Sequence, residues 1–204
     1  KLIGQGYHGT ALVSSVGKPA TKDENGPQGI TATLTGGSSS TSYTSADLLA
    51  ATFDREIAEA VGRSMGNDCM MVSGKSYSGL YGPGVNIHRT PYSGRNFEYY
   101  SEDPFISGKI CAAEVEGIQS KGVYVYLKHF ALNDQEAGRD GISVWTNEQA
   151  AREIYLQAFE YPITEADAHC VMTSFNRLGT MWAGGDYNLL TNIMRNEWKM
   201  SGFA

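Results

Sequence analysis

The sequence predicts an α/β protein built on a parallel β-sheet, and three observations support this fold class. Short runs rich in β-forming residues alternate with longer segments whose apolar side chains recur at helical spacing, a pattern typical of parallel strands joined by helical crossovers. Several of the short runs end directly in polar clusters, as the strands of catalytic barrels do. The 204 residues are enough for a single domain, 1–204, with a substantial core.

Four short runs are predicted to be strands: residues 69–72, 85–88, 122–127 and 168–174. The last two give the clearest signal, because GVYVYL and AHCVMTS are rich in β-formers and too short to be buried helices. The polar side chains that follow the runs are Arg89, Lys128, His129, Asn176 and Arg177. We therefore expect a site at the carboxyl ends of these strands.

Four longer segments are predicted to be helices: residues 45–65, residues 105–120, a segment beginning after Thr146 or Asn147, and residues 187–198. In the first, a Ser45/Asp47 cap precedes an apolar face that includes Phe53 and Ile57. Asp103 supplies a cap for the second. The third carries Ala151, Ile154 and Ala158 toward the core, and the glycine- and serine-rich residues 31–44 are predicted to form a loop over a site.

Composition narrows the class of ligand. The formal net charge is -6 and the chain has no run rich in lysine or arginine, which argues against binding to nucleic acid or to an anionic membrane surface. No stretch approaches the ~20 apolar residues of a membrane span. A neutral or weakly charged small molecule fits this composition better.

Three cysteines, Cys69, Cys111 and Cys170, lie far apart and form no CxxC pair, so we expect them to be buried thiols. Their odd number favours a reducing compartment, and therefore a cytoplasmic location, over secretion. Both locations stay open, because an export signal could be encoded in sequence that this chain lacks.

The stretch from residue 82 to residue 108 gathers the polar side chains Arg89, Arg95, Glu98, Glu102 and Asp103 together with aromatic rings. Guanidinium and carboxylate groups can share the vicinal hydroxyls of a sugar, and aromatic faces stack on its C–H surfaces. The alternative is an Arg–Glu network that only holds a long loop in place.

Lys128 and His129 form a second candidate cluster, followed closely by Asn133, Asp134 and Glu136. Adjacent strand residues normally face opposite ways, so both side chains can meet one ligand only if the backbone departs from regular β geometry. We predict such an irregularity at residues 128–130.

The segments GPGVNIHRTPYSGRNFEYYSEDP, KHFALNDQE and VMTSFNRLG resemble, in order and spacing, the signature stretches of family 3 glycoside hydrolases of the β-glucosidase type. The resemblance extends from Asp23 to Phe203 and implies a (β/α)8 TIM-like barrel that is incomplete at its C-terminal end here, since residues 202–204 look like the entrance to another strand. It also implies an α/β sandwich domain outside this chain, and neither a cofactor nor a metal.

The family's retaining mechanism uses two carboxyl groups ~5 Å apart. The resemblance places the Asp nucleophile just after Ala204 and the Glu acid/base elsewhere, so no catalytic carboxylate is expected within residues 1–204. The implied partners are a small-molecule sugar substrate and the C-terminal part of the same enzyme; a homo-oligomer stays open.

Carried over position by position, Arg95, Lys128 and His129 match residues that bind the non-reducing glucosyl unit, with Glu98 and Glu136 as weaker matches. The family's Asp-Gly-Pro motif corresponds to Asn25-Gly26-Pro27, so either Asp23 reaches the sugar instead or Asn25 makes an uncharged contact. A further departure is Phe175, where many relatives have a tyrosine.

Three other functions remain as alternatives. One is a metal-dependent barrel hydrolase, because His88 and His129 both follow predicted strands, although the chain has no HxH or HExxH spacing. The second is a non-catalytic carbohydrate-binding fragment of the same fold. The third is β-xylosidase or arabinosidase activity on the same scaffold.

Overall fold

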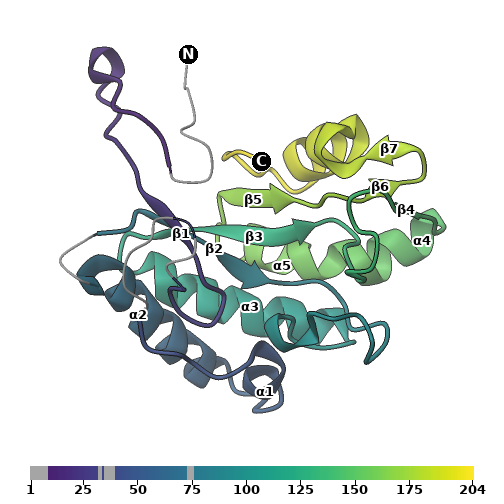
Figure 1. The fold of residues 1–204 in the computed structure, drawn as a ribbon, viewed down its shortest axis with the longest axis horizontal. Coiled ribbons are helices and arrows are strands. Elements are labelled where there is room, and N and C mark those ends of the chain that lie inside the picture. Colours follow the sequence, from purple (N-terminus) through teal and green to yellow (C-terminus); the bar gives the residue numbers. More distant parts are fainter. Residues whose placement is uncertain (1–8, 32–33, 35–39, 73–75) are drawn as a thin grey trace.

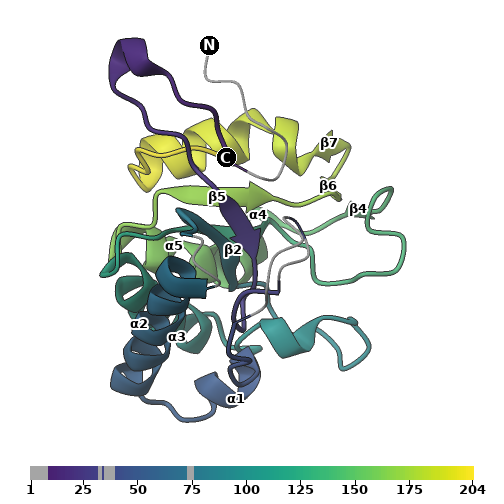
Figure 2. The same ribbon diagram turned by 60° about the vertical axis from the view of Figure 1, so that its left-hand side comes forward.

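The computed structural model describes residues 9–31, 34, 40–72 and 76–204. Its main sheet has four parallel strands in sequential order: β1 (Asp23–Asn25), β2 (Gly79–Gly84), β3 (Tyr124–Phe130) and β5 (Cys170–Thr173). Helices α2 (Arg55–Met71), α3 (Pro104–Gln119) and α5 (Gln157–Thr164) connect these strands and lie along one face of the sheet (Figures 1 and 2). The predicted α/β class with a parallel sheet is confirmed.

The sheet is open in the described part of the chain, with β1 at one edge and β5 next to the other. Beyond β5, Phe203 forms a parallel bridge with Cys170, and the Phe203 carbonyl accepts a hydrogen bond of 3.1 Å from the Val171 N–H. Residues 202–204 therefore begin a further pairing in the same direction, as predicted. The strands described here do not close into a barrel.

Two helix starts follow the predicted caps, whereas Ser45, before the helix at 46–50, makes no side-chain capping hydrogen bond. The Asp103 carboxylate accepts hydrogen bonds from the N–H groups of Phe105 and Ile106, at 2.8 and 2.9 Å, and α3 begins at the adjacent proline. The Asn147 side chain caps α4 (Glu148–Ala150), which continues through the π-helical η5 (Ala151–Leu156) into α5. The predicted helix at 187–198 is the π-helical η7 (Asn188–Glu197).

The prediction of one helix over residues 45–65 is wrong. The segment forms α1 (Ala46–Ala50) and, after a break, the longer helix α2. Phe53 adopts a φ of 54° and is 73% exposed, and the Asp54 carboxylate caps α2 by accepting from the Glu56 N–H at 2.8 Å. The apolar spacing continues across the break and therefore predicts one helix. The start of α2 is marked instead by its capping residue, Asp54, which the spacing does not reveal.

Two predicted strands are also corrected. Residues 69–72 belong mainly to the end of α2, because a short apolar run does not distinguish a buried helix from a strand. Residues 85–88 follow strand β2, whose sequence GLYGPG is poor in β-formers. A Cβ on Gly79 would lie 2.2 Å from the Tyr124 ring, so close packing explains a glycine within this strand.

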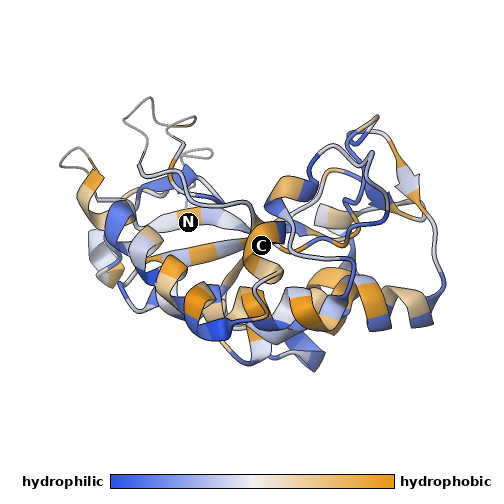
Figure 3. Ribbon diagram, turned by 90° about the horizontal axis from the view of Figure 1, so that it is seen from below, coloured by the Kyte–Doolittle hydropathy of each residue, from blue (hydrophilic) through white to orange (hydrophobic). Residues whose placement is uncertain are grey.

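The core lies between the sheet and the helices, and Figure 3 shows apolar segments along both. Helices α2 and α3 approach closely because Gly62 and Gly117 face the partner backbone; a Cβ on Gly62 would lie 2.1 Å from the Glu114 carbonyl oxygen. The three cysteines are free and buried, as predicted. Ile154 is 36% exposed, so the prediction that its side chain faces the core is wrong.

A second, small sheet of β4 (Ser143–Val144), β6 (Arg177–Leu178) and β7 (Met181–Trp182) lies beyond the carboxyl ends of β3 and β5 (Figure 1). The predicted loop at 31–44 falls partly outside the described residues, and residues 40–44 have no regular secondary structure. Within the described ranges, no helix has the length and apolar character that crossing a membrane requires.

Candidate functional site

A pocket of about 530 Å³ opens where the parallel strands end. Its lining residues come from β1, β2, β3, β5 and the loops that follow them: Asn25, Leu34, Tyr81, Arg95, Lys128, His129, Glu136, Arg139, Met172 and Phe175. Five residues predicted from the sequence are therefore brought together, namely Asn25, Arg95, Lys128, His129 and Glu136. The other two, Asp23 and Glu98, lie outside the lining and contact residues next to it or within it.

Lys128 and His129 both line this pocket although they are neighbours on β3. The pairing of β3 with β5 shifts register between Lys128 and Phe130, and the Lys128–His129 and Phe130–Ala131 peptide bonds are cis. The predicted irregularity at residues 128–130 is confirmed. Asn86 holds the backbone here, since its Oδ1 accepts from the His129 N–H at 2.6 Å and its Nδ2 donates to the His129 carbonyl at 3.0 Å.

The surroundings of His129 favour the neutral form of its ring. Burial, together with the positive charges of Lys128, Arg95 and Arg139, lowers its pKa well below the usual value. Its Nδ1 lies 2.8 Å from the hydroxyl of Tyr99, whose own pKa is raised by burial. When this hydroxyl donates to Nδ1, the ring proton lies on Nε2, which can then donate to a ligand hydroxyl.

Lys128 contacts both the β1 amide and a buried carboxylate. Its Nζ donates to Asn25 Oδ1 at 2.9 Å and lies 3.3 Å from Glu98 Oε2. Burial lowers the pKa of Lys128, and the negative charge of Glu98 opposes that effect. These two contacts hold the ammonium group in one place within the pocket.

The charged groups form one continuous network around the pocket. Glu98 pairs with Arg95 as well as with Lys128. Arg95 Nη1 lies 3.5 Å from Glu136 Oε1, and Glu136 Oε2 accepts from Arg139 Nη1 at 2.9 Å. Because each carboxylate lies between two cations, the donor groups are oriented before any ligand arrives.

Asp23 and Asn25 occupy different levels of β1. The Asp23 carboxylate accepts hydrogen bonds from the hydroxyls of Tyr124 and Tyr126, at 2.6 and 2.8 Å, beneath the pocket. Asn25 lines the pocket and contacts Lys128. The pocket thus receives an amide from β1, and a sugar contact by either residue stays a prediction.

Sequence reasoning missed Tyr81, Arg139 and Met172 as lining residues. The Arg139 guanidinium carbon lies 5.0 Å from the centre of the Phe175 ring, a cation–π arrangement. Arg139 also forms an ion pair with Glu136, and the three-residue spacing of these two charges is a sequence signal for it. Tyr81 stacks on Tyr126 with ring centres 4.4 Å apart, which the sequence pattern alone does not reveal.

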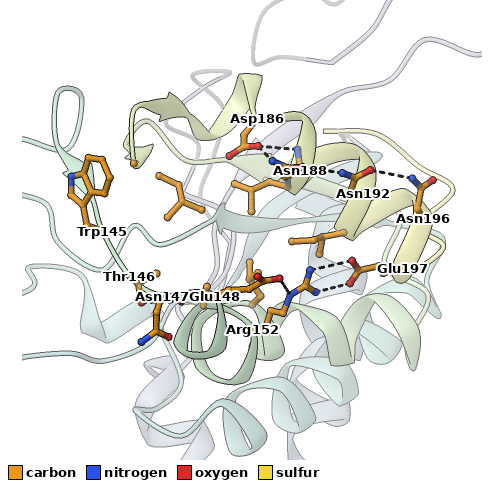
Figure 4. Close-up of a pocket in the computed structure, with 16 residues that line it drawn as sticks. Trp145, Thr146, Asn147, Glu148, Arg152, Asp186, Asn188, Asn192, Asn196 and Glu197 are labelled. Atoms are coloured by element: carbon orange, nitrogen blue, oxygen red, sulfur yellow. Dashed lines mark hydrogen bonds and ion pairs between the residues drawn. The ribbon is translucent and has the colours of Figure 1, made fainter.

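A larger pocket of about 750 Å³ lies elsewhere, between the α4–η5 helix and η7 (Figure 4). It contains none of the predicted site residues, and its wall carries the ion pair between Arg152 and Glu197. The smaller pocket is the better candidate because polar side chains converge there from the strand ends.

The histidines of the metal-dependent alternative do not form a shared site. His88 Nε2 lies 2.8 Å from the Tyr99 carbonyl oxygen and 3.0 Å from that of Asn96, and His88 does not line the pocket. Across the described ranges, no group of three or more His, Cys, Asp or Glu residues could hold a metal ion. The geometry offers this alternative no support.

A parallel α/β sheet whose strand ends present cationic, amide, imidazole and aromatic groups to one polar pocket defines the class as an α/β protein with a site suited to a small polar ligand. The chain belongs to glycosyl hydrolase family 3: the model of that family's N-terminal domain matches residues 16–204. This confirms the resemblance to family 3 glycoside hydrolases seen in the sequence.

The relatives that the chain matches include beta-glucosidases and an arabinopyranosidase. The chain is 39% identical over 192 residues to a beta-glucosidase of Ruminococcus albus, covering 94% of this chain and 20% of that protein. It is 36% identical to an exo-alpha-(1->6)-L-arabinopyranosidase of Bifidobacterium longum, covering 94% and 26%. The crystal structure of the Kluyveromyces marxianus beta-glucosidase in complex with glucose superposes with a TM-score of 0.91 at 33% identity, covering 98% and 24%. The chain thus spans about a quarter or less of the length of these two curated relatives.

Proposed function

We propose that this protein acts in the hydrolysis of terminal, non-reducing β-D-glucosyl residues of oligosaccharides or glucosides, with retention of configuration, by binding the glucosyl unit in the pocket at the strand ends. The observation that carries the proposal is the convergence of Asn25, Arg95, Lys128, His129 and Glu136 on that pocket. The beta-glucosidase names of several relatives support the same substrate.

The pocket chemistry suits a neutral polyol. The Lys128 ammonium, the Arg95 guanidinium and the His129 imidazole supply donors of different geometry, and Glu136 supplies acceptors. Tyr81 and Phe175 add aromatic surface against which a sugar ring can pack. Because the cations are already paired with carboxylates, the pocket does not demand a charged ligand.

The catalytic carboxyl groups are proposed to come from sequence beyond this chain. Glu98 and Glu136 are each paired with two cations, so neither resembles a free nucleophile or a protonated acid. Phe203 pairs with Cys170, whereas Met172, two residues further along β5, lines the pocket. A strand continuing in this register would bring residues just after Ala204 level with Met172, where the nucleophile Asp is expected.

The same register supports a (β/α)8 barrel that further strands would complete, with an α/β sandwich domain supplied by another part of the polypeptide. In this proposal residues 1–204 form a single domain, most of the barrel. Two findings are in line with it: the strands are ordered sequentially, and each pair is joined by a helical crossover.

A second candidate is arabinosidase or xylosidase activity. It is favoured by one observation, the 36% identity to an exo-alpha-(1->6)-L-arabinopyranosidase. A pentopyranose lacks the C6 hydroxymethyl group of glucose, so the two substrates differ in how much of the pocket they fill.

The test is hydrolysis of chromogenic aryl glycosides by the 204-residue chain and by the same gene product extended to its stop codon. We expect the extended form to cleave the β-glucoside with a higher kcat/KM than the β-xyloside or the α-L-arabinopyranoside, and the 204-residue chain to be silent. Turnover by the purified short chain would place the catalytic carboxylates within it. Silence of both forms toward every glycoside, with glucose binding retained, would indicate a carbohydrate-binding fragment.

A further inference from the structure

The hydroxyl of Tyr99 and the imidazole of His129 form a buried hydrogen bond beside the pocket at the strand ends. The hydroxyl oxygen lies 2.8 Å from His129 Nδ1, and the two rings meet edge to face with their centres 6.0 Å apart. His129 lines the pocket, whereas Tyr99 is 1% exposed and lies outside the lining. Any effect of the Tyr99 hydroxyl on a bound sugar therefore passes through the His129 ring.

The position of one proton decides what the His129 ring offers to a ligand. Burial and the neighbouring cations favour the neutral ring, in which one nitrogen donates a hydrogen bond and the other accepts one. Nδ1 is bonded to Tyr99, and Nε2 has no hydrogen-bond partner in the part of the chain that the structure describes. The direction of the bond between Tyr99 and Nδ1 therefore determines whether Nε2 is a donor or an acceptor.

The surroundings of Tyr99 favour its hydroxyl as the donor of this bond. If Nδ1 donated instead, the hydroxyl proton would need another acceptor, and the described residues provide none within hydrogen-bonding distance. A buried hydroxyl proton without an acceptor is costly. Donation from Tyr99 to Nδ1 avoids that cost and leaves the ring proton on Nε2.

The side chain of Asn133 supports the same direction. Burial raises the pKa of Tyr99, and a hydrogen bond from the Asn133 side chain opposes that effect, as a donor to the phenolic oxygen does. The acceptor of this amide, Asn133 Oδ1, is buried without a hydrogen-bond partner, so it does not receive the Tyr99 proton. The Tyr99 oxygen thus accepts on one side, and its proton is directed to His129.

We propose that Tyr99 is a positioning residue of the glycosidase reaction, whose hydroxyl donates to Nδ1 and so keeps the His129 proton on Nε2, toward the bound sugar. The inference rests on the proposed function, because it requires that His129 contacts the glucosyl unit. In this arrangement His129 is a fixed hydrogen-bond donor to a sugar oxygen and transfers no proton during turnover.

A fixed tautomer improves binding by removing a competing state. Without the Tyr99 hydroxyl, the ring proton would be shared between Nδ1 and Nε2, and a ring protonated on Nδ1 presents only a lone pair to the pocket. The apparent affinity for an accepting sugar oxygen falls with the fraction of rings in the wrong form. Tyr99 therefore acts on specificity without touching the substrate.

The test is a double-mutant cycle in the gene product extended to its stop codon, with an aryl β-glucoside as substrate. Tyr99→Phe keeps the ring but removes the hydroxyl, and should lower kcat/KM by about 3- to 30-fold. His129→Gln supplies an amide donor that has no tautomers. Adding Tyr99→Phe to His129→Gln should therefore change kcat/KM by less than about twofold.

Tyr100→Phe is the matched control. Tyr100 is also buried, and its hydroxyl donates to Glu114 in the core at 2.8 Å, so this variant removes a comparable buried hydroxyl from the adjacent residue. Its kcat/KM should equal that of the unmodified protein. An equal loss on adding Tyr99→Phe in both backgrounds would make Tyr99 merely structural and overturn the inference. An unmodified extended protein that cleaves no glycoside would count against the proposed function instead.

A second measurement needs no activity and no folded Tyr99 variant. Nitrogen NMR of the unmodified extended protein with isotope-labelled histidine distinguishes protonated from unprotonated ring nitrogens, and comparison with His129→Gln identifies the His129 signals. A proton on Nε2 supports the proposal. A proton on Nδ1, or a mixture of the two forms, contradicts it whatever the kinetics show.

Discussion

At the residue scale, the site is controlled by buried side chains whose partners are already in place. Lys128 and His129 are 2% and 4% exposed, so each hydrogen bond they give a ligand forms away from water. Losing such a bond leaves a desolvated group without a partner, which costs more than the net value of the bond itself.

Lys128→Ala and His129→Ala are each expected to lower kcat/KM for an aryl β-glucoside by roughly 10- to 100-fold, or about 1 to 3 kcal/mol, in the polypeptide that carries the catalytic carboxylates. The matched control is Lys109→Ala, since Lys109 pairs with Glu165 far from the pocket. Unchanged kinetics in both pocket variants, with folding verified by circular dichroism, would remove the two residues from the site.

Exchanging the β1 residues distinguishes their roles. Asn25→Asp places a carboxylate next to the Lys128 ammonium and is expected to raise kcat/KM several-fold, because a charge-assisted hydrogen bond to a sugar hydroxyl is stronger than an amide one. Asp23→Asn should instead lower the free energy of unfolding by about 1 to 3 kcal/mol, through the two tyrosine hydroxyls, with KM unchanged. The opposite pattern would make Asp23 the sugar ligand.

The residues found by sequence reasoning are those with a recognisable motif around them. Arg95, Lys128 and His129 follow from family segments, and all three line the pocket. Arg139 and Tyr81 lie outside these segments, and Met172 lies within one of them but has no polar group that would mark it as a ligand contact; only the fold brings the three residues to the same place. Chemistry can be read from a local pattern, whereas convergence depends on long-range packing.

At the element scale, helix α3 carries an acidic group in the core. Glu114 is 3% exposed and accepts a hydrogen bond of 2.8 Å from the Tyr100 hydroxyl. Burial raises the pKa of Glu114 from 4.5 to about 7, which favours the protonated form in the folded state. The stabilising contribution is fully present below the unfolded pKa and is lost as pH rises through the folded pKa.

Glu114→Gln is therefore expected to remove part of the loss of stability that the unmodified protein shows between about pH 4.5 and pH 7, on the order of 3 kcal/mol. Urea unfolding at several pH values measures the difference between the two proteins. Glu116→Gln, exposed on the same helix, is the control. Parallel stability curves for the unmodified protein and Glu114→Gln would contradict the argument.

The α2–α3 contact depends on glycine. Gly62→Ala is expected to destabilise the protein by at least about 1 to 3 kcal/mol, because the added methyl group would lie 2.1 Å from the Glu114 backbone oxygen and the helices must separate. Gly141→Ala is the matched control, since its nearest atom, the Gly138 carbonyl oxygen, lies 4.0 Å away. Equal melting temperatures for both variants would show that the helices adjust freely.

Helices could be predicted where a capping residue and the spacing of apolar residues indicate the same boundary, and could not be predicted where the two disagree. Asp103 and Asn147 mark the starts of α3 and α4 as expected. The helical spacing of apolar residues continues past Phe53. The helix is nevertheless broken there, where Phe53 adopts a positive φ that the spacing does not predict. Strand β2 was missed because it forms between neighbouring strands in spite of its glycines.

At the scale of the whole molecule, the sequential order of the parallel strands explains why the site residues come from four strands and the loops after them. The fold class was predictable because alternation of strands and helices is a property of the entire chain. Closure of the sheet depends on strands that the described structure does not contain, so the barrel remains a proposal.

If the barrel proposal is right, extending the polypeptide beyond Ala204 should cover the free edge next to β5. We expect slower hydrogen–deuterium exchange at residues 170–173 in the extended form, because pairing on both sides removes solvent access to that edge. Exchange of β3 amides, already paired with β2 and β5, serves as the internal reference. Equal rates at residues 170–173 in both forms would argue against a continuing strand.

The network of alternating charges from Lys128 through Glu98, Arg95 and Glu136 to Arg139 has a consequence for how substrate preference changes within the family. Neutralising one residue of the network leaves the charge of its neighbour without a partner, so a single substitution disturbs the whole pocket. New specificities are then reached most easily by paired exchanges that keep the sum of charges constant. Relatives with different sugar preferences should accordingly differ at two network positions together, rather than at one.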